Sequence, residues 1–195
     1  MMIKRLREQL SRMFGRGEAI DSSSEREAEV DAGTKNVVRA ATVDDLKELA
    51  DSLKRHDVDY LLIGGYALHA LGYQRNTTDI DLVLRPNRNQ GERLKRAMLA
   101  VMGEGIQGLD PAWFEQGETI RLCEKFTVDL MFNACGESFE SLLPFRQSID
   151  LDGVEIQSIS MEGLLKTKQS SRDKDALDRL ILERALLALK KESRP

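Results

Sequence analysis

Hydrophobic residues recur every three to four positions over 42–56, which predicts a helix with one buried face. Thr42 and Asp45 stand three residues apart just ahead of this apolar stripe, as the two members of a capping box do. The helix is therefore expected to begin here and to end near His56. The same reasoning predicts further helices over 66–71, around 94–101, over 161–170 and over 173–190.

Short runs of β-prone apolar residues lie between these helices. The run 59–63 ends at Gly64-Gly65, so a strand, a glycine turn and a helix are expected in succession. Asp152-Gly153 accepts the positive φ angles of a tight turn and predicts a hairpin, and a second hairpin is expected across Glu124-Lys125. The segment around Asp110-Pro111 is expected to be a loop. The predicted strands cover 59–63, 80–84, 119–123, 126–132, 148–151 and 154–159.

Residues 1–40 differ in character from the rest of the chain. Four apolar residues between Ile3 and Met13 have helical spacing, and a stretch rich in serine, glutamate and arginine follows them. This predicts an amphipathic arm and a flexible linker, followed by one domain over 41–195, in line with about 100 to 200 residues per domain. This pattern is typical of a helix that docks loosely on the domain, and also of a segment that touches a membrane surface or a partner.

Composition narrows the class of protein. A hydrophobic fraction of 41% and a charged fraction of 32% are typical of a globular protein. No stretch reaches the roughly 18 to 20 apolar residues of a membrane span, and the N-terminus lacks the apolar core of a signal peptide, so we expect a cytoplasmic protein. The net charge of -4 argues against a protein that wraps duplex nucleic acid by its field alone. Cys123 and Cys135 lack metal-ligand spacing and are expected to be ordinary buried thiols in a reduced setting.

Candidate chemistry begins with Asp79-Ile80-Asp81, which places two carboxylates on the same face of a predicted strand. Val128-Asp129-Leu130 repeats the pattern of a carboxylate between apolar residues on a later strand. Neighbouring strands lie only about 4.8 Å apart, so Asp79, Asp81 and Asp129 are able to converge. Taken singly, each of these aspartates also has an ordinary structural explanation, as a strand-start residue or a salt-bridge partner.

Clustered carboxylates repel one another, so a folded protein tolerates them chiefly when a cation neutralises them. Oxygen ligands favour Mg²⁺ or Mn²⁺ over zinc. Two such ions about 3.5 to 4 Å apart would stabilise the attacking and leaving oxygens of an in-line displacement at phosphorus. Gly64-Gly65 strengthens this interpretation, because backbone N–H groups between a strand and a helix are able to hold phosphate oxygens.

The order Ile63-Gly64-Gly65, Asp79-Ile80-Asp81 and Val128-Asp129-Leu130 resembles the nucleotidyltransferase superfamily. Its members include DNA polymerase β, the CCA-adding enzymes and the small bacterial AbiEii-type toxins, and the fuller strings 64–68 and 75–81 look most like the small bacterial members. The resemblance covers about residues 43–182. It implies an α/β (α+β) fold, a minimal mixed β-sheet flanked by helices, to which this chain adds its N-terminal helical arm.

The resemblance also implies roles for single residues. Asp79, Asp81 and Asp129 would bind the metal, with Asp129 helping to deprotonate the acceptor hydroxyl. Gly64 and Gly65 would cradle the triphosphate through their backbone, since this chain lacks the serine that many relatives carry at the second position. Among further nucleotide-binding residues, Arg75 and Thr77 would brace the carboxylates or meet the substrate, and Lys168, with Lys174 as the second choice, would contact the triphosphate.

These observations favour a metal-dependent nucleotidyltransferase that moves a nucleoside monophosphate from a nucleoside triphosphate to a hydroxyl. By resemblance, the acceptor would be RNA or tRNA, a protein side chain or a small molecule, and the protein would act as the toxin of a toxin-antitoxin pair with a cognate antitoxin. Two alternatives remain open: a non-catalytic module of the same fold that binds nucleotide or RNA, and an antitoxin-like interaction protein that works through the arm. Trp113 and Phe114 would either stack on a base or simply pack.

Overall fold

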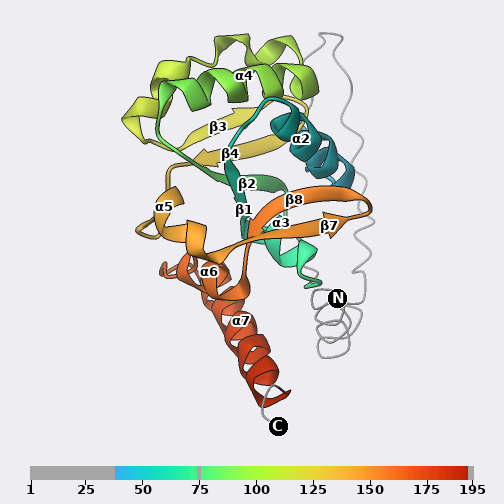
Figure 1. Cartoon of the computed structure of the whole chain (residues 1–195), viewed down its shortest axis with the longest axis vertical. Coiled ribbons are helices and arrows are strands. Elements are labelled where there is room, and N and C mark those ends of the chain that lie inside the picture. The colour runs from blue at the N-terminus through green and yellow to red at the C-terminus, as the bar shows by residue number, and fades with distance from the viewer. Residues whose placement is uncertain (1–37, 74–75, 193–195) are drawn as a thin grey trace, which may run out of the picture.

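The computed structural model describes residues 38–73 and 76–192 and builds them around a six-stranded sheet (Figure 1). The order of the strands across this sheet is β3-β4-β2-β1-β8-β7, and β5 and β6 form a separate two-stranded ribbon. The strands are β1 (Tyr60–Ile63), β2 (Asp79–Leu84), β3 (Ile120–Cys123), β4 (Thr127–Met131), β5 (Asn133–Ala134), β6 (Glu137–Ser138), β7 (Arg146–Leu151) and β8 (Val154–Ile159).

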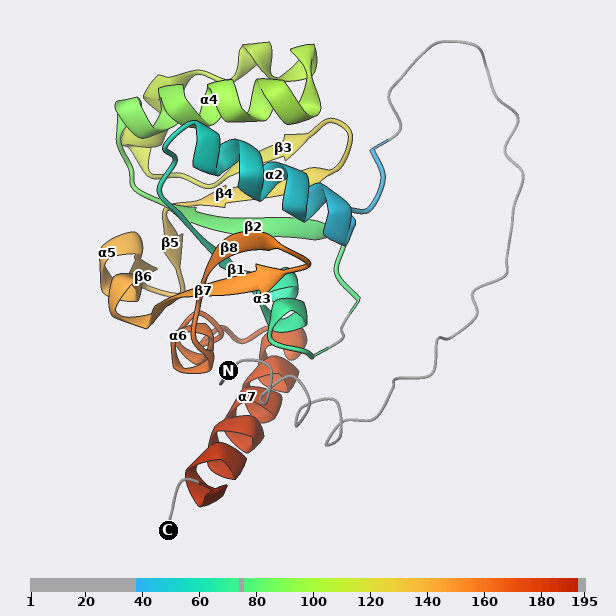
Figure 2. The same cartoon turned by 45° about the vertical axis from the view of Figure 1, so that its right-hand side comes forward.

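Helices surround the sheet. The α-helices are α2 (Val43–Arg55), α3 (Gly64–Ala70), α4 (Arg88–Met102), α5 (Phe139–Leu142), α6 (Met161–Lys166) and α7 (Asp173–Glu192). The 3₁₀ helices are η1 (Glu104–Gly108), η2 (Pro111–Gln116) and η3 (Leu143–Phe145). Helices α2 and α4 pack against each other, joined by a hydrogen bond that Ser52 donates to the carbonyl of Ala97, whereas α6 and α7 lie at the opposite end of the molecule (Figure 2).

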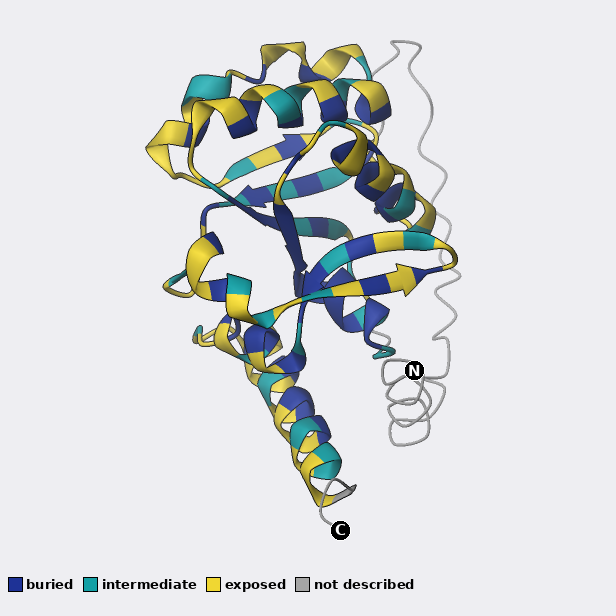
Figure 3. Ribbon diagram, viewed as in Figure 1, coloured by how far each residue is buried: buried dark blue, intermediate teal, exposed yellow. Residues whose placement is uncertain are grey.

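The strands pair in both directions, so the mixed sheet flanked by helices that the sequence led us to expect is confirmed. Strand β1 is antiparallel to β2 and parallel to β8, while β2 is parallel to β4. Both predicted hairpins are present, as β3 with β4 and as β7 with β8. The central strands are dark in a view coloured by burial, because helices and neighbouring strands cover them (Figure 3). All four residues of β1 are buried.

Three local predictions were wrong. The segment around Asp110-Pro111, expected to be a loop, begins the 3₁₀ helix η2, because Asp110 caps η2 by accepting a hydrogen bond from the N–H of Ala112. The helix predicted over 161–170 ends at Lys166. Cys123 and Cys135 are exposed thiols rather than buried ones, because β3 is an edge strand and Cys135 occupies the turn between β5 and β6.

Two further expectations concern the chain outside this body. The arm and most of its linker fall within residues 1–37, which lie outside the described residues, so the boundary placed at 40 stays a prediction. Across the described ranges, no helix combines the length and the apolar character that a membrane crossing requires.

The start of α2 is fixed by the capping box that the sequence predicted. Thr42 accepts a hydrogen bond from the N–H of Asp45, whose carboxylate accepts one from the N–H of Thr42 at 2.7 Å. The guanidinium of Arg39 donates two hydrogen bonds to the same carboxylate, from Nη1 to Oδ2 at 2.6 Å and from Nη2 to Oδ1 at 2.7 Å. The hydrogen bonds from Arg39, and then those from Thr42, outweigh the effect of burial and lower the pKa of Asp45 to about 2.

This pKa predicts how stability depends on pH. The pKa of Asp45 is lower in the folded protein than the ordinary value of 3.8, so its contribution is complete above pH 4 and is lost as the pH falls towards 2. The Asp45→Asn variant should unfold with a free energy about 2 kcal/mol lower than the wild type at pH 7, and the difference should vanish near pH 2. Urea unfolding at a series of pH values measures this. Asp44→Asn, at the exposed neighbouring position, is the matched control and should change little.

Candidate active site

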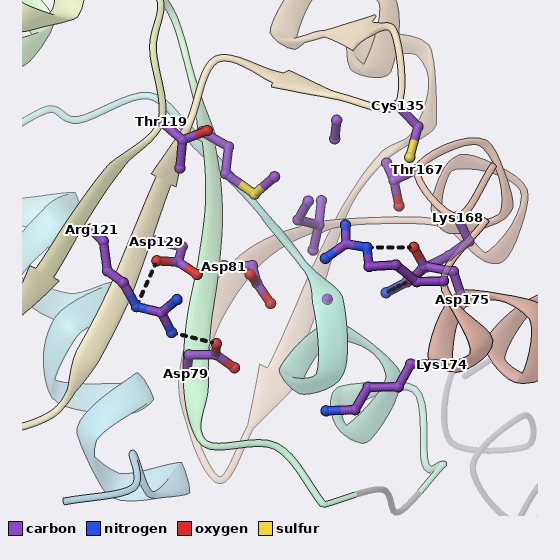
Figure 4. Close-up of a pocket in the computed structure, with 15 residues that line it drawn as sticks. Asp79, Asp81, Thr119, Arg121, Asp129, Cys135, Thr167, Lys168, Lys174 and Asp175 are labelled. Atoms are coloured by element: carbon purple, nitrogen blue, oxygen red, sulfur yellow. Dashed lines mark hydrogen bonds and ion pairs between the residues drawn. The ribbon is translucent and has the colours of Figure 1, made fainter. Parts of the chain in front are cut away.

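Three carboxylates stand on one wall of a pocket of about 430 Å³ (Figure 4). In the parallel pairing of β2 with β4, Asp81 is the register partner of Asp129, and Asp79 lies two residues before Asp81. Side chains of register partners point to the same face of a sheet, as do residues two apart. Asp79 and Asp81 are half-buried while Ile80 and Leu82 are fully buried, so the alternation predicted for this strand is confirmed.

Arg121 is the positive charge nearest to these carboxylates. It comes from β3, where its register partner is Asp129, and its guanidinium bridges two of the three carboxylates. Its Nη2 donates to Oδ2 of Asp79 at 3.1 Å, and its Nε lies 3.5 Å from Oδ1 of Asp129. The side chain is 57% exposed, so solvent screens these pairs and Arg121 is free to leave at small cost.

The side chain of Asp129 is more buried than that of Asp79, at 16% exposed against 28%. Burial raises its pKa, the positive charge of Arg121 lowers it, and the negative charge of Asp79 raises it again, so that the pKa lies above the usual range of a carboxyl. Its Oδ1 is buried and accepts no hydrogen bond from any described residue. A buried carboxylate oxygen in this state either takes up a proton or turns to a cation.

The residues present fit a divalent cation in their chemistry. The donors are carboxylate oxygens, which Mg²⁺ and Mn²⁺ prefer, and the buried Oδ1 of Asp129 lacks the partner that an ion would supply. In the arrangement described, however, no three acidic, imidazole or thiol groups of residues 38–73 and 76–192 are placed to ligate one ion together. Holding an ion therefore requires that Arg121 withdraw and that the carboxylates turn towards a common point.

Gly64 lets Asp81 occupy its place in the pocket. The residue follows β1 directly and has a φ of +69°, in the left-handed region that side chains disfavour. A Cβ built on Gly64 would lie 2.7 Å from Cγ of Asp81 and closer still to its Oδ2. The glycine turn and the carboxylate strand are therefore mutually dependent, which explains why the sequence needs a residue without a side chain here.

Replacing Gly64 tests this dependence. Gly64→Ala should lower the free energy of unfolding by about 1 to 2 kcal/mol for the left-handed backbone alone, and by more because Asp81 must be displaced. Gly117 is the matched control, since it has the same φ of +69° with no atom within 4 Å of an added Cβ. Chemical denaturation of both variants isolates the second contribution. Equal losses would show that Asp81 does not depend on the missing side chain.

Thr77 packs beside Gly65 and contacts Asp79, the first residue of β2. A Cβ on Gly65 would lie 2.5 Å from Cβ of Thr77, so Thr77 fills the space that the glycine leaves. The hydroxyl of Thr77 lies 3.3 Å from the carbonyl of Asp79 and 3.5 Å from its Oδ1. Of the two roles considered for Thr77, these contacts favour bracing. Arg75, its companion in that prediction, lies outside the described residues.

The opposite wall of the pocket carries basic side chains from the segment that joins α6 to α7 and from the start of α7. Lys168, Arg172 and Lys174 all line it (Figure 4). The structure thus brings both predicted lysines to the same pocket as the three predicted aspartates. Acidic and basic walls that face each other are suited to a ligand with a polyanionic chain whose charge is partly neutralised by cations.

Lys168 is engaged by carboxylates rather than pointing free into the pocket. Its Nζ lies 3.2 Å from Oδ1 of Asp175 and 3.0 Å from Oδ2 of Asp178, and all three residues are buried. Burial raises the pKa of Asp175, but hydrogen bonds from Ser170 and Lys168 together with nearby positive charge outweigh it and leave the pKa lowered. Lys168 therefore ties α7 to the pocket wall.

Lys174 is better placed than Lys168 to meet an anion. It is exposed on the first turn of α7, and its side chain extends towards the carboxylate wall (Figure 4). No carboxylate of the described residues lies within salt-bridge distance of Lys174, whereas Arg172 approaches Oδ2 of Asp175 at 3.5 Å. The ion pairs of Lys168 favour Lys174, and which of the two lysines contacts a triphosphate stays a prediction.

Sequence reasoning missed Arg121 and Arg172 as residues of the pocket. Arg121 lies opposite Asp129 in the observed register of β3 against β4, which is shifted by one residue from that of a two-residue turn at Glu124-Lys125. Of the two aromatic residues considered for stacking on a base, Phe114 packs in the core, with its ring centroid 5.2 Å from that of Phe132. Trp113 lies on η2, is 42% exposed and does not line the pocket.

Comparison with known proteins gives only distant likenesses. No family model matches the chain, and no curated protein matches it in sequence. Among solved structures, the lincosamide antibiotic adenylyltransferase LnuA is 16% identical, over 75% of this chain and 99% of that one, with a TM-score of 0.48. ANT(2″)-Ia is 14% identical over 77% and 94%, with a TM-score of 0.48. A nucleotidyltransferase-like protein of Paracoccidioides brasiliensis is 18% identical over 79% and 91%, with a TM-score of 0.45.

Proposed function

We propose that this protein is a metal-dependent nucleotidyltransferase, which moves a nucleoside monophosphate from a nucleoside triphosphate to a hydroxyl and releases pyrophosphate. At the low identities and TM-scores of its structural neighbours, the proposal has to rest on the site itself. One observation carries it: Asp79, Asp81 and Asp129 share a pocket wall that faces Arg172 and Lys174. Such a pocket offers one wall for cations and one for phosphate oxygens.

Binding would divide the triphosphate between the two walls. Asp79, Asp81 and Asp129 would hold Mg²⁺ or Mn²⁺, which supplies positive charge to the α-phosphate and to the oxygens that attack and leave. Lys174 and Arg172 would neutralise the β- and γ-phosphates, where negative charge grows as pyrophosphate departs. Gly64, which lines the pocket, would allow the phosphate chain to approach the backbone closely, with Gly65 behind it.

Asp129 would serve as the general base. The acceptor oxygen forms a bond to the α-phosphorus while the bond from that phosphorus to the bridging oxygen of pyrophosphate breaks, and the hydroxyl proton passes to Oδ2 of Asp129, because Oδ1 is the oxygen that would face the cation. Burial raises the pKa of Asp129, which favours proton uptake relative to an exposed aspartate. Positioning the two reactants would supply much of the remaining rate.

The acceptor class remains a proposal from the resemblance of the motifs. The acceptor would be RNA or tRNA, a protein side chain or a small molecule. If the protein acts as a toxin, a cognate antitoxin would inhibit it. A non-catalytic nucleotide or RNA binder of the same fold is the alternative. Three carboxylates on one wall count against it, because they repel an anionic ligand unless cations intervene.

Labelled nucleotides test the activity. The protein is incubated with Mg²⁺, cellular RNA or lysate, and each nucleoside triphosphate labelled either at the α- or at the γ-phosphate. Label from the α-phosphate should become attached to an acceptor, while label from the γ-phosphate should appear in pyrophosphate. Attachment of the γ-label would indicate a phosphotransferase. No attachment of either label with any nucleotide would overturn the proposed activity.

A further inference from the structure

Helix α7 is apolar on two opposite sides. One side, with Leu182 and Ala185, is buried against the body. On the other, Leu177, Leu180 and Leu187 are exposed at 55%, 43% and 59%, although leucines of this number on one helix normally face a partner. The helix projects from the end of the molecule that lies opposite α4, so none of the other described elements covers its outer side (Figures 1 and 2).

The exposed leucines belong to a stripe with the spacing of a coiled-coil seam. Counting from the first residue of α7, exposed residues follow at alternating steps of four and three, the repeat that keeps one seam facing a partner helix. We call this set the α7 stripe, and it consists of Asp173, Leu177, Leu180, Arg184, Leu187 and Lys191. We propose that the α7 stripe pairs with the α7 stripe of a second copy of this chain, antiparallel, to form a two-fold symmetric dimer.

The order of charges along the stripe selects the antiparallel arrangement. In an antiparallel pair centred between Leu180 and Arg184, Leu177 faces Leu187 of the second copy, and Asp173 at one end faces Lys191 at the other. A two-fold axis makes every such contact twice, so the surface is complementary to itself. A parallel pair would instead place Asp173 against Asp173 and Lys191 against Lys191, and like charges would face each other at both ends.

Arg184 fits this register as well. It faces Leu180 of the second copy, where its aliphatic stem covers the leucine while the guanidinium reaches water. In the parallel register, Arg184 would face another Arg184 in the middle of the seam. A polar residue at a seam position is a known means of fixing register and orientation, at a cost in stability. The leucine pairs thus supply the apolar contact, and the charged residues of the stripe decide how the helices are arranged.

The dimer would reach the pocket of the proposed active site. Asp173 precedes Lys174, which lines that pocket, so Lys191 of the second copy would lie beside the pocket rim. The two residues lie about 27 Å apart within one chain, since a helix rises about 1.5 Å per residue. They therefore cannot pair within the same helix, and any interaction between them reports on a second copy.

Molar mass in solution tests the apolar part of the proposal. Light scattering of the full chain at micromolar concentrations should give a dimer, and the Leu177→Glu, Leu187→Glu variant should give a monomer with unchanged circular dichroism. Trp113→Glu replaces an exposed hydrophobic residue outside the α7 stripe and should remain a dimer. A monomeric wild type, or a dimer that survives both leucine replacements, overturns the proposal.

A charge exchange tests the orientation. Lys191→Asp should weaken dimerisation about tenfold, because two aspartates then face each other twice across the two-fold axis. Adding Asp173→Lys should restore it. Each replacement places a charge that the dipole of α7 disfavours, so the two destabilising effects on the helix itself would add. Recovery of dimerisation in the double variant therefore requires pairing between copies. A double variant weaker than Lys191→Asp would overturn the antiparallel arrangement.

Discussion

Asparagine at both Asp79 and Asp81 is expected to reduce nucleotidyl transfer by about a thousandfold or more, while the protein stays folded. Asparagine keeps the shape of the side chain and removes the charge that would hold a divalent cation. Both residues are only half-buried on an open pocket wall, so the change should cost little stability. The measurement is the rate at which α-label reaches the acceptor, beside an unfolding curve of the same preparation.

The chain contains its own matched control for this experiment. Asp150-Leu151-Asp152 is a second Asp-x-Asp, but it lies at the turn between β7 and β8, outside the pocket. Asp152 has a φ of 53°, which asparagine adopts readily, so the Asp150→Asn, Asp152→Asn variant should fold and retain full activity. Equal losses in the two double variants would mean that the first loss has nothing to do with the pocket.

Methionine in place of Lys168 is expected to destabilise the protein by about 3 to 5 kcal/mol. The replacement retains much of the length of the side chain but leaves Asp175 and Asp178 buried without the ammonium that pairs with both. Breaking a buried ion pair from one side is costly because the remaining carboxylates lose the ammonium and are too deeply buried for water to replace it. Chemical denaturation measures the loss.

Lys166 provides the comparison, because it lies two residues away and pairs with Glu137 at 2.9 Å on the surface. Lys166→Met should cost no more than about 1 kcal/mol, as exposed ion pairs do. If Lys168→Met were as mild as Lys166→Met and lost only nucleotide affinity, Lys168 would be a triphosphate ligand, as the sequence first suggested, rather than the anchor of α7.

Local patterns in the sequence indicated which faces of the two strands carry the carboxylates, whereas the pairing of β2 with β4 joins distant segments. The alternation around Asp79 and Asp81 determines which side chains face the core, and the hairpin before Asp129 brings that strand into the sheet. The capping box at Thr42 and Asp45 was equally local, since both partners lie within one helical turn. Such features depend on neighbours a few residues apart, which a single sequence displays directly.

What escaped prediction depends on contacts between distant segments. The engagement of Lys168 is set by carboxylates on the next helix, whose approach no local pattern reveals. Arg121 becomes part of the pocket only when the register of β3 against β4 is known. The exposure of Cys123 follows from the position of β3 at the edge of the sheet, because the same run of residues in a central strand would be buried.

Binding of Mn²⁺, followed by electron paramagnetic resonance in the presence of a nucleotide analogue that cannot be cleaved at the α-phosphate, tests the central claim most directly. The wild type is expected to bind the ion, Asp129→Asn to lose it, and Arg121→Gln to bind it more tightly, since the competing positive charge is gone. An ion bound equally by the wild type and Asp129→Asn, or by neither, would contradict a metal site formed by these three aspartates.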